Sequence, residues 1–186
     1  MKKLATQDRS ALIKLASGLS PGSPERVAIL AGLTKQSNDG VNIPGKHILD
    51  NAKVYGDAKV FGNARVSGDA VVGGKAKVDG NAKVFGDAKV YDKAKVIGDA
   101  KVFGDAEVSG DAHVFGNAEV FGDALVFGDA KVYGNATLSG RVFVTGEAEV
   151  YGKANISGTA VILGGDWDGS EGKITSGRWM APGVPA

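Results

Sequence analysis

The sequence predicts an all-β solenoid, a rod in which one short structural unit is stacked many times. Residues 51–164 repeat every six residues without an insertion and hold 19 hexads, beginning N-A-K-V-Y-G, D-A-K-V-F-G, N-A-R-V-S-G. Within a hexad, Ala and the Val two residues later face the same side of a short strand. One such strand buries too little apolar surface to fold alone, whereas stacked copies bury a continuous core.

Each hexad also carries its own corner. Most hexads end in Gly, and the next begins with Asp or Asn. Glycine tolerates the positive φ that a tight corner requires, and Asp and Asn are common in turns. The 29 glycines among 186 residues therefore indicate regular corners in a rigid rod, although such an excess alone would suggest a flexible chain.

The repeat resembles the hexapeptide-repeat family, which includes acyltransferases. It places an aliphatic residue four positions before a small one, as in Val54 and Ala58, or Val60 and Ala64. The resemblance implies a left-handed parallel β-helix with three hexads in each triangular coil, and hence about six coils. The aromatic residues directly after Val differ from the small residue common there. This difference leaves a right-handed helix, like that of bactofilin-type polymer-forming proteins, as the alternative.

Three segments follow along the chain: an N-terminal helical hairpin and linker over 1–40, the repeat β-helix over 41–164, and a C-terminal cap or tail over 165–186. Asp8 and Gly18 bound the first expected helix, and Ser23 and Pro24 begin the second. The apolar residues that both helices must bury, and that are candidate interface residues, are Leu12, Leu15, Ile29 and Leu30. This leader is similar to short leaders of bacteriophage-encoded proteins.

The ends of the repeat region carry two further signals. Ile48 already fits the six-residue register, so the helix is expected to begin before residue 51. Trp167 and Trp179, the only tryptophans, lie in the tail, where the register breaks. Because the open end of a solenoid needs a cap, we expect both indoles to close the last coil.

One outward face is apolar over the last three coils. If residues 18 apart stack, the outward positions that share this face are Leu125, Phe127, Phe143, Val161 and Leu163. Large exposed apolar patches usually mark contacts. Three interpretations stay open: a terminal segment of the same chain covers the patch, a subunit or partner binds it, or it forms a ligand groove.

The other two faces combine basic and aromatic columns. Two aromatic ladders are expected, Phe85-Phe103-Phe121 and Phe115-Tyr133-Tyr151. Basic rows with aromatic side chains can bind single-stranded nucleic acid, but Asp or Asn beside nearly every Lys offsets the charge, so we expect plain stabilisation of the rod. Residues 51–104 carry a net charge of +4 and residues 105–164 a net charge of −5, which could favour head-to-tail or antiparallel assembly.

Catalysis is not favoured. The family's acyltransferases are typically trimers with a histidine base at a subunit boundary, and this chain offers only His47 and His113. His113 is the candidate base of that alternative, but it lies mid-strand where Lys or Glu usually stands, and this position favours a solvated substitution. No loop leaves the 19 hexads to build a pocket. The related γ-type carbonic anhydrases need three histidines, and the tail acids Asp166, Asp168 and Glu171 lack a calcium-loop pattern.

Composition narrows the remaining possibilities. The chain has no cysteine and a net charge of +1, and it lacks the apolar stretch of a secretory signal or a membrane span. We therefore expect a non-catalytic structural or assembly protein without cofactor, metal or membrane association. It would be a homo-oligomer, a trimer before a dimer, or part of a larger assembly such as a phage particle, located in the cytoplasm or the virion.

Overall fold

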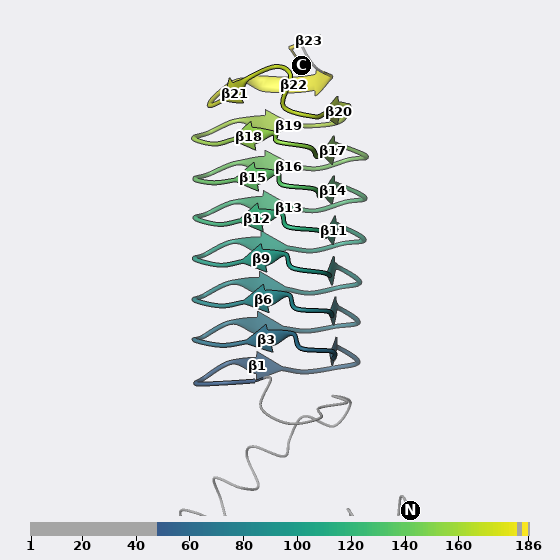
Figure 1. The fold of residues 1–186 in the computed structure, drawn as a ribbon, viewed down its shortest axis with the longest axis vertical. Helices are drawn as coiled ribbons and strands as arrows, with labels where there is room; N and C mark the ends of the chain where they lie inside the picture. Colours follow the sequence, from purple (N-terminus) through teal and green to yellow (C-terminus); the bar gives the residue numbers. More distant parts are fainter. Residues whose placement is uncertain (1–47, 182–183, 186) are drawn as a thin grey trace, which may run out of the picture. The chain divides into compact units, whose positions relative to one another are not determined.

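The computed structural model describes residues 48–181 and 184–185, and over these residues it contains β-strands and turns but no helix. The strands form three sheets in which each strand pairs with the strand three places further along the chain, except that the last strand pairs antiparallel with the strand directly before it (Figure 1). The first sheet consists of β1 (Lys53–Val54), β4 (Val71–Val72), β7 (Lys89–Val90), β10 (Glu107–Val108), β13 (Leu125–Val126), β16 (Phe143–Val144), β19 (Val161–Ile162), β22 (Arg178–Ala181) and β23 (Val184–Pro185).

The other two sheets have seven strands each. The second sheet consists of β2 (Lys59–Val60), β5 (Lys77–Val78), β8 (Lys95–Val96), β11 (His113–Val114), β14 (Lys131–Val132), β17 (Glu149–Val150) and β20 (Asp166–Trp167). The third sheet consists of β3 (Arg65–Val66), β6 (Lys83–Val84), β9 (Lys101–Val102), β12 (Glu119–Val120), β15 (Thr137–Leu138), β18 (Asn155–Ile156) and β21 (Lys173–Ile174). The strands of adjacent coils pair in parallel, so the predicted parallel β-solenoid with 18 residues per coil is confirmed.

The core is a column of small and branched apolar side chains. The Ala and Val of each hexad point inward and are fully buried, from Ala58 and Val60 to Ala160 and Ile162. No polar or charged side chain is buried among the described residues. The residue between Ala and Val points outward, as alternation along a strand requires. The repeat therefore fills the interior and leaves the outward positions free to vary.

The corners depend on left-handed backbone. The corner glycines of the repeats have φ between +64° and +78°. They stack so closely that a Cβ added to Gly104 would lie 3.0 Å from the backbone N of Gly122 in the next coil. Asp92 takes the glycine position at one corner, with φ 59°, and its carboxylate accepts a hydrogen bond from Gly110 N at 3.2 Å. Glycine at this position thus meets both a conformational and a steric requirement.

The solenoid has about seven coils, where the repeat count predicted about six. The additional coil comes from the tail, since β20, β21 and β22 pair in parallel with β17, β18 and β19. Asp166 pairs with Glu149, 17 residues earlier, so the coil is one residue short at this step. The expected break in register after residue 164 is therefore a shortened corner, and residues 165–181 continue the solenoid.

The N-terminal end begins as the register predicts, because Ile48 forms a parallel bridge with Val66. The expected hairpin over residues 1–40 lies outside the described residues, and so do its candidate interface residues and His47. The left-handed sense of the coil stays a prediction.

Candidate functional site

The apolar face is defined by Leu125, Phe127, Phe143, Val161 and Leu163, and the structure brings these five residues together on the first sheet. Leu125 pairs with Phe143 across β13 and β16, and Phe143 pairs with Val161 across β16 and β19. Phe143 is 39% exposed, while the other four side chains are half-buried. The rings of Phe127 and Phe143 meet edge to face, with centroids 6.4 Å apart. The predicted clustering of these five side chains at 18-residue spacing is confirmed.

Opposite charges bound the apolar face along the solenoid axis. Glu107 on β10 pairs with Leu125 on one side, and Arg178 on β22 pairs with Val161 on the other. The Tyr91 hydroxyl donates a hydrogen bond to the Glu107 carboxylate. Arg178 is exposed and forms no ion pair with another residue that the structure describes. The face is therefore an apolar strip with a carboxylate at one end and a guanidinium at the other.

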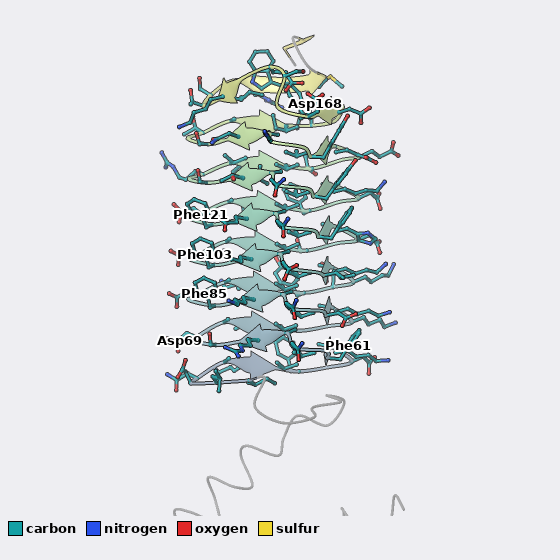
Figure 2. The ribbon with its side chains drawn as sticks, viewed as in Figure 1. Phe61, Asp69, Phe85, Phe103, Phe121 and Asp168 are labelled. Atoms are coloured by element: carbon teal, nitrogen blue, oxygen red, sulfur yellow. The ribbon has the colours of Figure 1, made fainter. Side chains whose placement is uncertain are left out.

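The two predicted aromatic ladders are confirmed. Phe85, Phe103 and Phe121 lie above one another in successive coils (Figure 2), and their stacked ring centroids are 4.7 Å and 4.8 Å apart. The second ladder, Phe115-Tyr133-Tyr151, stacks at 4.7 Å and 5.1 Å. Within a ladder the ring faces lie against one another and are not available for a base to stack on. This geometry favours stabilisation of the rod over the nucleic-acid interpretation.

Charged columns near the second ladder are partly compensated. Lys131 Nζ lies 2.6 Å from Glu149 Oε1, and the Tyr133 hydroxyl donates to Glu149 Oε2 at 2.9 Å. The hydrogen bond from Lys131, followed by that from Tyr133, lowers the pKa of Glu149. Burial, with the Glu149 hydrogen bond next, raises the pKa of Tyr133 to about 12. On the third sheet, Lys101 pairs with Glu119 at 2.7 Å.

His113 lies on β11 between two lysines. It pairs with Lys95 on one side and Lys131 on the other. Burial, and then these two positive charges, lower its pKa, while Asp111 and Asp129 act in the opposite direction. The imidazole is therefore neutral at pH 7. Its column neighbours supply no carboxylate of the kind that orients a catalytic base, and the acyltransferase alternative stays a prediction. The described residues contain no cluster of three His, Cys, Asp or Glu that could hold a metal.

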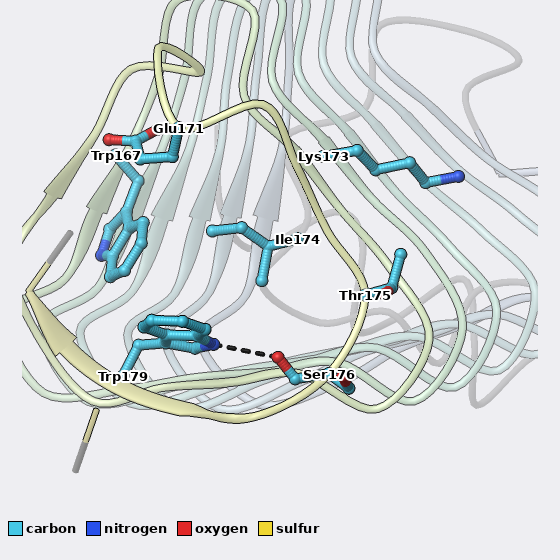
Figure 3. A pocket seen from close by; sticks show the side chains of 7 residues that line it. All are labelled: Trp167, Glu171, Lys173, Ile174, Thr175, Ser176 and Trp179. Carbon is cyan, nitrogen blue, oxygen red and sulfur yellow. Dashed lines mark hydrogen bonds between the residues drawn. The ribbon is translucent and has the colours of Figure 1, made fainter. Parts of the chain in front are cut away.

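A cavity in the seventh coil was not predicted from the sequence. It has a volume of about 500 Å³, and the residues that line it are Trp167, Glu171, Lys173, Ile174, Thr175, Ser176 and Trp179 (Figure 3). The two indoles meet edge to face at 6.2 Å. Their N–H groups donate to the carbonyl oxygens of Gly164, at 2.8 Å, and Ser176, at 3.0 Å. The one feature of the sequence that pointed to this part of the chain was the position of both tryptophans in the tail.

The fold and the repeat define the class of this protein, a hexapeptide-repeat-like parallel β-helix. In the comparison with protein families, residues 58–74 match the model described as the YdcK beta solenoid repeat. No curated protein and no solved structure matches the chain. The resemblance of the leader to bacteriophage proteins is not shown. None of the described residues belongs to a helix that is long and apolar enough to cross a membrane.

Proposed function

We propose that this chain is a non-catalytic structural or assembly protein, a rigid solenoid that binds another protein through its apolar face. The observation that supports the proposal is the concentration of Leu125, Phe143 and Val161 in one outward column of β13, β16 and β19. The same column carries Lys53 and Lys89 in the lower coils. Polar residues therefore fit these outward positions, and the fold does not require apolar ones.

Burial of this face supplies a driving force for association. Phe143 alone is 39% exposed in the described structure. Because fully burying a large apolar side chain contributes about 1.5–3 kcal/mol, covering this exposed part contributes about 0.6–1.2 kcal/mol. The backbone ladders and the Ala/Val core hold the strands in place without a partner, so little ordering accompanies binding. A rigid surface of this kind binds with a small entropic cost.

The assembly we propose is a homo-oligomer, for which the family resemblance favours a trimer, or a larger structure such as a phage particle. The N-terminal hairpin expected over residues 1–40 would be a second docking element. Deleting residues 1–40 tests this role, since an unchanged assembly would exclude it.

The molecular mass in solution tests the proposal directly. Multi-angle light scattering should give a multiple of the 18.9 kDa chain mass for the native sequence and a monomer for Phe143→Lys. Val71→Lys is the matched control, because Val71 occupies the same outward column four coils below and outside the apolar face. Circular dichroism verifies that both variants fold. A native chain that stays monomeric up to near-millimolar concentration would exclude self-assembly through this face.

A further inference from the structure

The apolar face and the charges at its ends form a self-complementary pattern. In one outward column the order along the axis is Glu107, Leu125, Phe143, Val161, Arg178. Phe143 stands in the middle, an aliphatic residue lies one coil away on each side, and opposite charges lie two coils away. We propose that this face binds a second copy of the chain in antiparallel orientation, about a two-fold axis that runs along β16. The inference rests on the proposed function, and it specifies an antiparallel dimer in place of the trimer that the family resemblance favours.

The two-fold axis fixes which residues meet. Rotation about an axis parallel to the strands keeps each column opposite itself and reverses the order of the coils. Phe143 then meets Phe143 of the second copy, and Leu125 meets Val161 of the second copy. Glu107 meets Arg178 of the second copy, and this contact occurs twice because the interface is isologous.

The neighbouring column has the same symmetry. Its members are Ser109, Phe127, Thr145, Leu163 and Met180, since Met180 directly follows Trp179, the partner of Ile162. Thr145 lies at the centre, and Phe127 would meet Leu163 of the second copy. Met180, which is 58% exposed, would cover the end of the interface opposite Ser109. Both columns are therefore apolar within one coil of the axis, apart from the central threonine.

The charges discriminate between orientations. Glu107 is held in place by the Tyr91 hydroxyl, and Arg178 has no ion-pair partner among the described residues. A parallel dimer or a three-fold assembly with parallel axes keeps equal coils at equal height, which places Glu107 level with other copies of Glu107. Only the antiparallel arrangement brings Glu107 to Arg178. The same rotation places Arg141 and Glu147, which are exposed at the corners of the central coil, each opposite its own copy. These like-charge contacts lie in solvent and are screened by salt.

The size of the face sets the concentration at which the dimer forms. The five coils from β10 to β22 span four intervals, or about 20 Å at a strand spacing of ~4.8 Å. Specific interfaces commonly bury about 1,200–2,000 Å² in total, and a face of this height lies at or below the lower end. We therefore expect a dimer that dissociates in the micromolar range.

Charge reversal at the two ends tests the orientation. Glu107→Arg places two arginines at each end of its own homodimer, and Arg178→Glu places two glutamates there. Each variant alone should weaken dimerisation about tenfold or more, as measured by sedimentation equilibrium. A one-to-one mixture should restore it, because in the mixed dimer the introduced arginine faces the introduced glutamate and the native Arg178 faces the native Glu107. The double variant should also dimerise.

A control pair separates this contact from general charge attraction. Asp99→Arg and Lys153→Glu make the same charge changes at the corner between the second and third sheets, away from the first sheet. Neither change should weaken the dimer, and mixing them should have no effect. Tyr91→Phe, with melting followed by circular dichroism, reports whether loss of the hydrogen bond to Glu107 alone affects folding.

The outcomes distinguish this inference from the proposed function. A trimer that Phe143→Lys dissociates would overturn the antiparallel dimer and leave the assembly function intact. A dimer whose affinity does not change in Glu107→Arg or Arg178→Glu would also overturn it. A native monomer at all concentrations would overturn the antiparallel dimer and the homo-oligomer of the proposed function.

Discussion

Replacing a corner glycine should destabilise the solenoid, and the loss of stability should be larger for alanine than for the bulkier aspartate. Gly104 has φ +71°, and a Cβ there would lie 3.0 Å from Gly122 N and 3.4 Å from Gly122 O. Left-handed backbone costs an alanine about 1–2 kcal/mol. The contact with the next coil adds about 1–3 kcal/mol, because the stacked backbone cannot move away without breaking its ladder. We therefore expect Gly104→Ala to lower the free energy of unfolding by about 2–5 kcal/mol.

Gly104→Asp should cost less than Gly104→Ala, although aspartate is larger. Asp92 shows why, since it holds φ 59° at an equivalent corner and accepts a hydrogen bond from the N–H of Gly110 in the next coil. Aspartate tolerates left-handed backbone better than alanine. The N–H of Gly122, which donates to no other described residue, could donate to the new carboxylate. Such a bond contributes about 0.5–1.5 kcal/mol.

Urea denaturation followed by far-UV circular dichroism measures both variants against the native chain. Gly172→Ala is the control for backbone strain alone, because Gly172 has φ +77° but a Cβ there meets nothing within 4 Å. If Gly104→Ala costs no more than Gly172→Ala, the stacking contact carries no energy. If Gly104→Asp costs as much as Gly104→Ala, the hydrogen bond at the Asp92 corner is not the reason that corner tolerates aspartate.

Three further predictions concern the ladders, the ion pair and the last coil. Phe103→Ala removes two stacked contacts and should lower the free energy of unfolding by about 1–3 kcal/mol in urea titrations, whereas Phe61→Ala, outside any ladder, should cost less. Glu149 has a folded pKa below its usual 4.5, so it stabilises the fold above that pH, and this contribution is lost as the pH falls through the lowered value. Glu149→Gln should flatten the stability profile in that acid range, and an unchanged profile would contradict it. Because Trp167 and Trp179 both lie in the seventh coil, tryptophan fluorescence should report unfolding at lower urea than circular dichroism does, and coincident transitions would exclude separate fraying of that coil.

Strict periodicity made most of the fold predictable. The 19 hexads repeat one local conformation without an insertion. Once Ala58 and Val60 are assigned to the core, the residues at the same two positions of every later hexad are therefore assigned to the core as well. The 18-residue spacing of Phe85, Phe103 and Phe121 was also enough to predict that their rings stack. The apolar face followed in the same way, because outward residues 18 apart must share a sheet.

The contacts of side chains within a column were less predictable. Spacing shows that Lys131 and Glu149 are neighbours, but the third member of the cluster, Tyr133, reaches Glu149 diagonally over 16 residues. Asp92 stands at a Gly position of the repeat, and the spacing does not show that its carboxylate contacts the next corner. Period alone specifies which residues are adjacent in a column and leaves open which rotamers bring their polar atoms together.

The seventh coil shows a physical limit of repeat counting. The interior coils admit only residues whose volume fits the cross-section, and Val fills this position in each hexad up to Val132. Toward the C-terminus Val144 and Val150 keep this residue, but larger inward residues also occur, namely Leu138, Ile156, Ile162 and finally Trp167. In the last coil the Trp167 indole packs edge to face against Trp179 and is 1% exposed, and the corner at Gly165 is one residue shorter than those of the repeats. The break in sequence register after residue 164 therefore coincides with a larger inward residue at the end of the stack, and the parallel strands continue beyond it.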